Sequence, residues 1–198
     1  MNDQYPKFWH DRGYLPHYDP GSIVQFVTFR LAGSLPQNVL NNYKALAERR
    51  LISEIEYHRL VERYLDSGKG KLLLQNASVA AMIEDNLLYF HTKRYILIAW
   101  VIMPNHVHLL LRPIENVSLS VIIHSIKSFT ANRANHLLGL KGKFWSNDYF
   151  DRYIRNREHF DKTIAYIHNN PVKAGLCLRA ADWPFGSARF LAESECHD

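Results

Sequence analysis

The segment that decides the fold covers residues 95–112 and reads YILIAWVIMPNHVHLLLR. Its first half is an apolar run rich in β-branched and aromatic residues that ends at Met103, and a second apolar run begins at His106. Pro104 and Asn105 lie between the two runs and favour a turn. Two short apolar runs joined across a short turn predict a pair of antiparallel strands.

The other elements are predicted from hydrophobic spacing and from chain-breaking residues. Pro171 is expected to end the last helix, because proline disfavours a helical residue before it. In chain order we predict a strand at 23–31, mostly helix at 36–65, helices at 78–90 and 117–138, a short strand or extended segment at 149–155, and a helix at 157–169.

This order predicts an α+β fold, with a ferredoxin-like antiparallel sheet and helices on one face. We expect one domain over residues 1–198. Residues 36–92 would form a helical insertion after the first strand, and residues 177–198 a C-terminal tail. The aromatic, turn-rich stretch at 9–22 would form an ordered N-terminal arm.

The composition excludes several classes of protein. A hydrophobic share of 47% and a charged share of 22% are typical of a globular rather than a disordered chain. The longest apolar run, at 95–103, is too short to cross a bilayer, and the N-terminus has no apolar secretory stretch. Cys177 and Cys196 are too few for a disulfide framework or a cysteine-rich metal site. We therefore expect a protein of the reducing cytoplasm with no membrane association.

The net charge of +5 is concentrated in one part of the chain. Between Lys127 and Arg179 there are ten Lys/Arg against four Asp/Glu, interleaved with aromatic residues. Cations for phosphates and aromatic faces for bases suit single-stranded nucleic acid, although a solvated basic face with core aromatics is the alternative. The candidate contacts are Lys127, Arg133, Lys143, Trp145, Arg152, Arg155, Lys162 and Lys173.

His106 and His108 form an H-x-H triplet on a predicted strand. Alternation sends both imidazoles to one face and Val107 to the other. Two neighbouring imidazoles are good ligands for a divalent cation and poor core residues, since each ring needs polar partners. The alternative is two partly exposed histidines without a role. The preceding turn would place the pair near a sheet edge, open to solvent.

Tyr166 lies beside the apolar stripe of the last predicted helix rather than on it. Lys162 and Asn170 lie one turn away on either side. Such a tyrosine on a polar face could act as a nucleophile, with Lys162 favouring the phenolate or holding a phosphate and Asn170 offering an oxygen to a metal. The alternatives are an exposed surface tyrosine and a helix-capping asparagine. The stripe itself consists of Phe160, Ile164 and Ile167.

Several separated motifs, taken in order, resemble the REP-associated tyrosine transposases, relatives of the single-tyrosine HUH transposases. The resemblance extends from about Arg12 to Phe190, and the region 36–90 carries the least of it. One departure, Phe185-Gly186 after Trp-Pro where the family often has Trp or Tyr and then Ser, weakens only what is inferred about the tail. The motifs are RGYLPHYDPGSIVQFVTFRL (12–31), MPNHVHLLL (103–111), FWSNDYFDRYIRN (144–156), YIHNNPVKAGL (166–176) and ADWPFGSARF (181–190).

The resemblance implies a metal-dependent DNA strand transferase. His106 and His108 match the family's metal-binding pair, Asn170 its polar third ligand and Tyr166 its catalytic tyrosine. The implied cofactor is Mg²⁺ or Mn²⁺, and the implied intermediate is a 5′-phosphotyrosine that needs no nucleotide cofactor. The implied partner is single-stranded or hairpin (REP-like) DNA of the nucleoid, with Trp145 near the hairpin and the N-terminal arm near a guide sequence at its foot.

Other interpretations remain open from the sequence. A domesticated transposase could bind hairpins without cleaving them, and a metal hydrolase unrelated to DNA is a third class, which the basic window disfavours. Tyr149 and Tyr153 are competing nucleophiles that lack a polar residue one turn away to complete a metal site. We expect a monomer, with a helix-exchanged dimer as the alternative.

Overall fold

The computed structural model describes residues 9–11, 16–18 and 22–194. Of the predicted N-terminal arm, strands β1 (Trp9–Asp11) and β2 (Pro16–Tyr18) pair antiparallel. The rest of that arm up to residue 21, and Cys196 in the tail, lie outside the described residues. No helix in the described ranges has both the length and the apolar character needed to cross a membrane.

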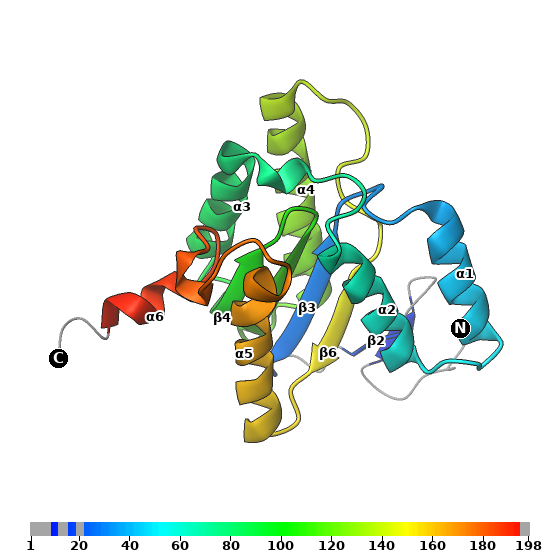
Figure 1. Ribbon diagram of the computed structural model, residues 1–198. Helices are drawn as coiled ribbons and strands as arrows, with labels where there is room; N and C mark the ends of the chain where they lie inside the picture. Colours follow the sequence, from blue (N-terminus) through cyan, green and yellow to red (C-terminus); the bar gives the residue numbers. More distant parts are fainter. Residues whose placement is uncertain (1–8, 12–15, 19–21, 195–198) are drawn as a thin grey trace.

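The main sheet has four antiparallel strands in the order β4-β5-β3-β6 (Figure 1). The predicted α+β fold is confirmed, and this strand order is the ferredoxin-like one. The central hairpin forms as predicted, and a register shift between Leu97 and Ala99 interrupts its pairing. The strands are β3 (Gln25–Arg30), β4 (Tyr95–Ile102), β5 (His106–Pro113) and β6 (Phe150–Tyr153).

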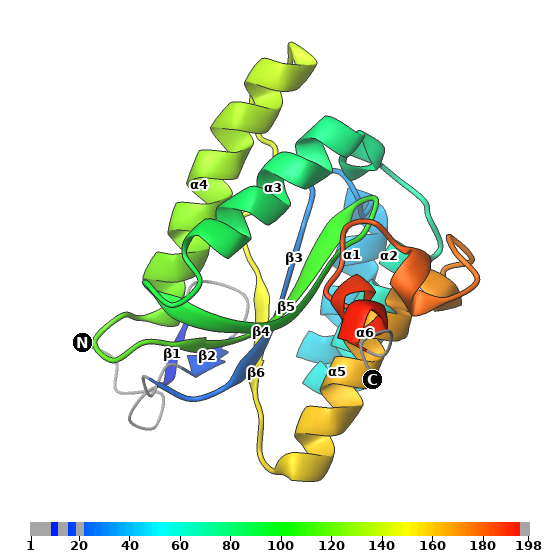
Figure 2. The same cartoon turned by 90° about the vertical axis from the view of Figure 1, so that its left-hand side faces the viewer.

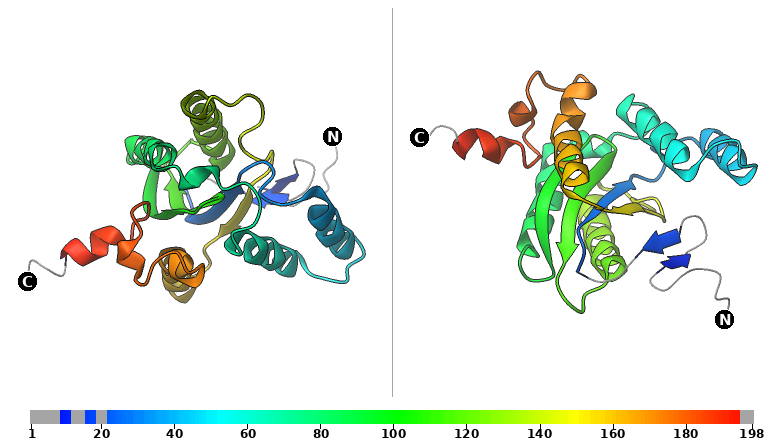
Figure 3. Two further views of the ribbon diagram at one scale, coloured as in Figure 1. Left: turned by 45° about the horizontal axis from the view of Figure 1, so that its top comes forward. Right: turned by 90° about the horizontal axis from the view of Figure 1, so that it is seen from below.

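Helices cover both faces of this sheet (Figures 2 and 3). α3 and α4 pack on one face, whereas α5 packs on the other, on the same side as α1 and α2. The prediction of helices on one face only is therefore wrong. The helices are α1 (Gln37–Glu48), α2 (Glu54–Asp66), α3 (Ala77–Tyr89), α4 (Leu119–Leu138), α5 (Arg157–Lys173) and α6 (Arg189–Ser194), with short turns η1 (Leu73–Gln75) and η2 (Ala180–Asp182).

Two apolar clusters explain why the sheet needs both layers. Along β5, Val107, Leu109 and Leu111 point into the cluster beneath α3 and α4, and Leu110 points into the cluster beneath α5. A strand buried on both faces reads as a continuous apolar run, which hides which residue faces which layer. Alternation then places the two histidines, at even positions, on the α5 face.

The range 36–92, predicted to be a helical insertion, contains two different kinds of packing. α3 lies in that range, but its side chains Val79, Ile83 and Leu87 are fully buried in the main core. α1 and α2 instead form a helical pair that lies beside the sheet, which we call the α1–α2 hairpin (Figure 1). We propose that this hairpin, and not α3, is the insertion.

α5 is longer than predicted, because it continues through Pro171 to Lys173. Proline lacks the N–H that would bond one turn back, but only one helical bond is lost so close to the end of the helix. Both Asn170 and Pro171 are buried, and the Ala174 N–H still donates to the Asn170 carbonyl at 3.0 Å. The extra turn fixes Asn170 one helical turn after Tyr166.

Trp145 belongs to the core. Its side chain is only 4% exposed, and its indole N–H donates to the Thr130 hydroxyl at 2.9 Å. Its ring packs edge-on against Phe29, with 4.9 Å between the ring centres. The prediction that Trp145 binds nucleic acid is therefore wrong, because its aromatic face is used in packing. A single sequence does not separate a stacking platform from a core aromatic.

Replacing Trp145 with alanine should consequently lower the free energy of unfolding by about 3–5 kcal/mol, the usual cost of deleting a buried aromatic ring. Urea unfolding followed by circular dichroism measures the change. The matched control is Phe129→Ala, at a residue 49% exposed on α4, which should change stability by less than about 0.5 kcal/mol. Equal small effects for both variants would contradict the burial argument.

Candidate active site

The two histidines of β5 converge on one point. His106 and His108 are both 0% exposed, and their Nε2 atoms lie 3.0 Å apart on the α5 face of the sheet. The expectation of a pair near an open sheet edge is wrong, because β5 lies between β4 and β3. Two buried imidazoles whose nitrogens meet form a preorganised pair of nitrogen ligands.

Asn105 sets the protonation of His106. The Asn105 amide N–H donates to the Leu65 carbonyl at 3.0 Å, so its Oδ1 is the atom that faces His106 Nδ1 at 2.6 Å. His106 Nδ1–H therefore donates, and its Nε2 carries a lone pair directed at His108. A hydrogen-bonded Nδ1–H of this kind is typical of metal-binding histidines.

His108 is held by Thr28 on the neighbouring strand, whose hydroxyl lies 2.7 Å from His108 Nδ1. A threonine hydroxyl can donate or accept. When it accepts, His108 Nε2 also offers a lone pair, and the two nitrogens can share a cation. Burial lowers the pKa of His106 to about 3 and that of His108 well below its usual range, so both rings are neutral at pH 7 and able to bind metal.

Tyr166 on α5 reaches this pair. Its hydroxyl lies 3.5 Å from His108 Nε2. Its ring packs edge-on against Phe26, with 5.9 Å between the ring centres. Its ring also contacts the apolar cluster beneath α5, while its hydroxyl faces the polar groups of the site. Because Tyr166 lies beside the apolar stripe of α5 and not on it, the hydroxyl points toward the two histidines.

Asn170 completes the group from the same helix. It is 0% exposed, its Nδ2 lies 3.4 Å from His108 Nε2, and its Oδ1 has no hydrogen-bond partner among the described residues. An unpaired buried amide oxygen is costly, and amide oxygens are suitable ligands for Mg²⁺ and Mn²⁺. The arrangement therefore fits a divalent cation.

Two carboxylates from α2 also enter the site, and sequence reasoning missed both. Asp66 Oδ1 lies 3.7 Å from His106 Nε2, and Glu62, one turn earlier, accepts a hydrogen bond from the Tyr166 hydroxyl. Burial raises the pKa of Asp66 to about 6, and burial followed by the charge of Asp66 raises the pKa of Glu62 to about 7. Their helical spacing of four residues was the available signal.

The phenol is held in its neutral form. Burial, followed by the charges of Glu62 and Asp66, raises the pKa of Tyr166 above its ordinary value. Lys162 does not offset this effect, because its Nζ pairs with Glu158 at 2.6 Å on the exposed face of α5. The expectation that Lys162 favours the phenolate is therefore wrong. Lys173 lies closer, with its Nζ 5.1 Å from the centre of the Tyr166 ring.

A pocket of about 400 Å³ opens between the α1–α2 hairpin and the strands β3 and β6. Thr28, which lies beside His108, and Glu62 also line this pocket, so the pocket borders the site. His58 and Phe150 stack within it at 3.8 Å between ring centres.

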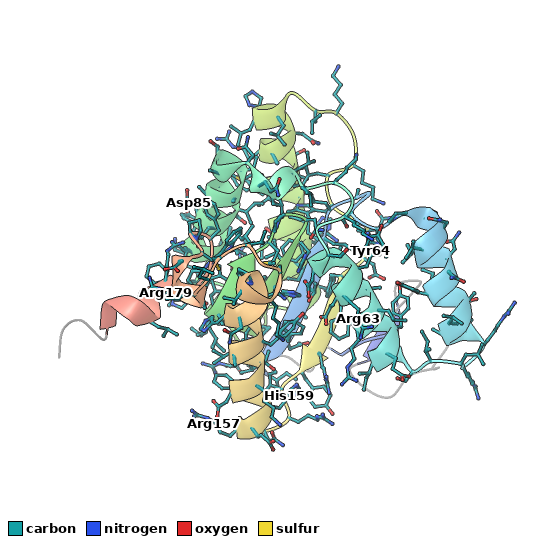
Figure 4. The ribbon with its side chains drawn as sticks, in the orientation of Figure 1. Arg63, Tyr64, Asp85, Arg157, His159 and Arg179 are labelled. Atoms are coloured by element: carbon teal, nitrogen blue, oxygen red, sulfur yellow. The ribbon has the colours of Figure 1, made fainter. Side chains whose placement is uncertain are left out.

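The basic residues predicted to bind nucleic acid occupy different surroundings. Arg133, Lys143, Arg155, Lys162 and Lys173 are exposed, and Arg152 is partly buried near Glu62. Lys127 donates to the backbone carbonyl of Asn147 at 2.8 Å, which is a structural role. Figure 4 shows Arg63 on α2 and shows Arg157 and His159 at the beginning of α5.

The competing tyrosines lie elsewhere. Tyr149 is 7% exposed and packs in the core beneath α3 and α4, and Tyr153 is 36% exposed at the end of β6. Tyr166 is thus the tyrosine that the fold brings to the histidine pair.

Comparisons with known proteins agree with this geometry. Residues 79–170 match the family model described as "Transposase IS200 like", a range that includes the histidine pair, Tyr166 and Asn170. Over 90 residues the chain is 32% identical to the REP-associated tyrosine transposase of Escherichia coli K12, covering 45% of this chain and 52% of that protein. The resemblance to the REP-associated tyrosine transposases is confirmed.

A second relative with this resemblance is a putative REP-associated tyrosine transposase of Haemophilus influenzae, 27% identical over 103 residues, with 46% of this chain and 57% of that protein covered. The chain thus aligns with just over half the length of the curated REP-associated transposases it matches. A solved REP-associated tyrosine transposase bound to a REP hairpin superposes with a TM-score of 0.53 at 20% identity, covering 90% of this chain and 84% of the other. At that identity the superposition shows a shared fold.

Proposed function

We propose that this chain cleaves and joins single-stranded DNA at hairpin structures through a 5′-phosphotyrosine on Tyr166. The observation that carries the proposal is that two groups of α5 converge on His108 Nε2, the Tyr166 hydroxyl at 3.5 Å and Asn170 Nδ2 at 3.4 Å. A nucleophile beside a preformed set of metal ligands is the arrangement that phosphoryl transfer requires.

His106, His108 and Asn170 would hold the divalent cation. Their nitrogen and oxygen donors, without thiolate, suit Mg²⁺ or Mn²⁺. When bound, the cation polarises the scissile phosphate and offsets the charge that develops in the transition state. The two unpaired oxygens, on Asn170 and Asp66, support this assignment because the described protein atoms do not satisfy them.

The side chains supply the remaining steps. Glu62 accepts the proton of the Tyr166 hydroxyl as the phenolic oxygen attacks phosphorus. The new bond joins this oxygen to phosphorus, and the bond from phosphorus to the 3′ oxygen breaks. The leaving 3′ oxygen takes up a proton from solvent, which releases a 3′-hydroxyl. Because the phosphodiester is conserved in the phosphotyrosine, another 3′-hydroxyl can reverse the step and no nucleotide cofactor is needed.

REP-like hairpin DNA is the substrate we propose, since the solved neighbour is described as bound to a REP hairpin. The exposed cations Arg133, Lys143, Arg155 and Lys173 would contact phosphates, and Arg152 and Lys162 would do so from the neighbouring surface. We further propose that the N-terminal arm reads the foot of the hairpin, that the protein acts as a monomer, and that it acts at the nucleoid.

Replacing Arg155 with glutamine should weaken hairpin binding and reduce the slope of log K against log salt by about 1, because one phosphate contact is lost. Fluorescence anisotropy over a salt series measures both quantities. The matched control is Arg179→Gln, at an arginine already paired with Asp182 at 2.6 Å. An unchanged slope for the Arg155 variant would remove that residue from the DNA surface.

The function itself is tested by incubating the protein with labelled hairpin DNA and Mn²⁺, followed by denaturing electrophoresis. A labelled band that migrates with the protein supports the proposal. Tight hairpin binding without any such band would instead favour a non-cleaving hairpin-binding protein. The absence of both hairpin binding and a covalent band would contradict both functions.

A further inference from the structure

The α1–α2 hairpin contributes more than surface to the site. α2 ends at Asp66, and this residue places a carboxylate oxygen 3.7 Å from His106 Nε2. The ligand atoms of Asp66, His106 and His108 all lie within 4.8 Å of one another. Ligands bound about 2.1 Å from one cation lie about 3.0–4.2 Å apart, so these three atoms are close to the geometry of a common ligand shell.

One carboxylate oxygen of Asp66 lacks a hydrogen-bond partner in the described part of the chain. Its Oδ1 is buried and has no hydrogen-bond partner among the described atoms. The neighbouring imidazole donates through Nδ1 to Asn105, so its Nε2 turns a lone pair rather than an N–H toward Asp66. The Asp66 carboxylate also has a hydrogen bond with Asn170, and a cation between its unpaired oxygen and the imidazole nitrogens would offset the cost of burying that oxygen.

Asn105 connects this carboxylate to the histidine pair. Its amide nitrogen donates to the carbonyls of Leu65 at 3.0 Å and Lys69 at 3.4 Å, on either side of Asp66. Its Oδ1 meanwhile accepts from His106. Asn105, in the turn between β4 and β5, therefore positions both the end of α2 and the His106 imidazole.

We propose that Asp66 is an anionic ligand of the same divalent cation, so that the inserted α1–α2 hairpin completes the metal site. This inference rests on the proposed function and adds a fourth donor to it. Two imidazoles, one amide and one carboxylate form a more strongly binding set than the three neutral groups alone, because the carboxylate adds negative charge. The cation would then bridge the sheet, α5 and α2.

This arrangement makes the position of the hairpin depend on the metal. A ligand that binds only when α2 is docked stabilises the docked state by mass action. Mn²⁺ should therefore slow tryptic cleavage within α2, after the exposed residues Arg59 and Arg63. The protection should be absent when the carboxylate is removed.

The test measures Mn²⁺ affinity by electron paramagnetic resonance, together with tryptic protection, without any DNA. Asp66→Asn keeps the shape of the side chain and removes its charge, and should weaken Mn²⁺ binding by about tenfold or more and abolish the protection. Asp66→Glu, which keeps the charge, should retain part of both. The control Asp161→Asn, at an exposed carboxylate on α5, should match the wild type.

The outcomes separate this inference from the proposed function. Tight Mn²⁺ binding that is the same in the wild type and in Asp66→Asn would overturn the role of Asp66 and leave the site of His106, His108 and Asn170 intact. Absence of Mn²⁺ binding in the wild type would overturn the metal site as a whole. Weakened binding in Asp66→Asn and in Asp161→Asn alike would also overturn the inference, because the effect would then follow from charge in general.

Discussion

Tyr166→Phe should abolish formation of the covalent DNA adduct and reduce strand cleavage by about 10⁴-fold or more, the scale of losing an essential nucleophile. The substitution removes one oxygen and keeps the ring that packs on Phe26. Hairpin binding should remain within about twofold of the wild type, since the phenol is placed for chemistry and the exposed cations are placed for phosphates. Denaturing electrophoresis measures the adduct, and anisotropy measures binding.

The matched control is Tyr153→Phe, which removes the same oxygen from an exposed tyrosine at the end of β6. That variant should form the adduct at the wild-type rate. An adduct that persists in Tyr166→Phe would reject the proposed nucleophile. Loss of the adduct in Tyr153→Phe would instead indicate that Tyr153, on β6, is the nucleophile.

His106→Ala should eliminate cleavage while sparing most hairpin binding, because the imidazole serves the metal and not the docking of DNA. We expect cleavage to fall by about 10³-fold or more, since a metal ligand is removed and Asn105 loses its partner. Treating the wild type with EDTA should have the same effect, and adding Mn²⁺ should restore only the wild type.

His136→Ala, at an exposed histidine on α4, is the control and should leave both activities unchanged. Circular dichroism at the assay temperature checks that the His106 variant is folded. Parallel loss of cleavage and binding in a folded His106→Ala protein would contradict the separation of metal chemistry from DNA docking.

The parts of the site that could be predicted are those set by local geometry. Alternation along one strand puts His106 and His108 on one face, and one helical turn separates Tyr166 from Asn170. The packing of α5 against β4 and β5 then brings the two pairs together. The assignment of roles within this group stays a prediction until the variants are measured.

The parts that could not be predicted depend on contacts between distant segments. Glu62 and Asp66 look like ordinary solvated acids on a charged helix, and only the docking of α2 against the sheet brings them to His106 and Tyr166. Trp145 has the composition of a DNA-stacking residue, yet packing against Phe29 removes it from the surface. Pro171 suggested a helix end, but burial of the last turn outweighs the loss of one hydrogen bond.

The central claim is that the Tyr166 oxygen is the atom joined to DNA at a metal-dependent site. Mass spectrometry of a tryptic digest of the trapped complex tests it directly, because the three candidate tyrosines fall in different peptides: Tyr166 in residues 163–173, Tyr149 in 144–152 and Tyr153 in 153–155. We predict a phosphonucleotide on the 163–173 peptide, formed with Mn²⁺ and absent with EDTA. A phosphonucleotide on either other peptide, or one formed equally well with EDTA, would contradict the account.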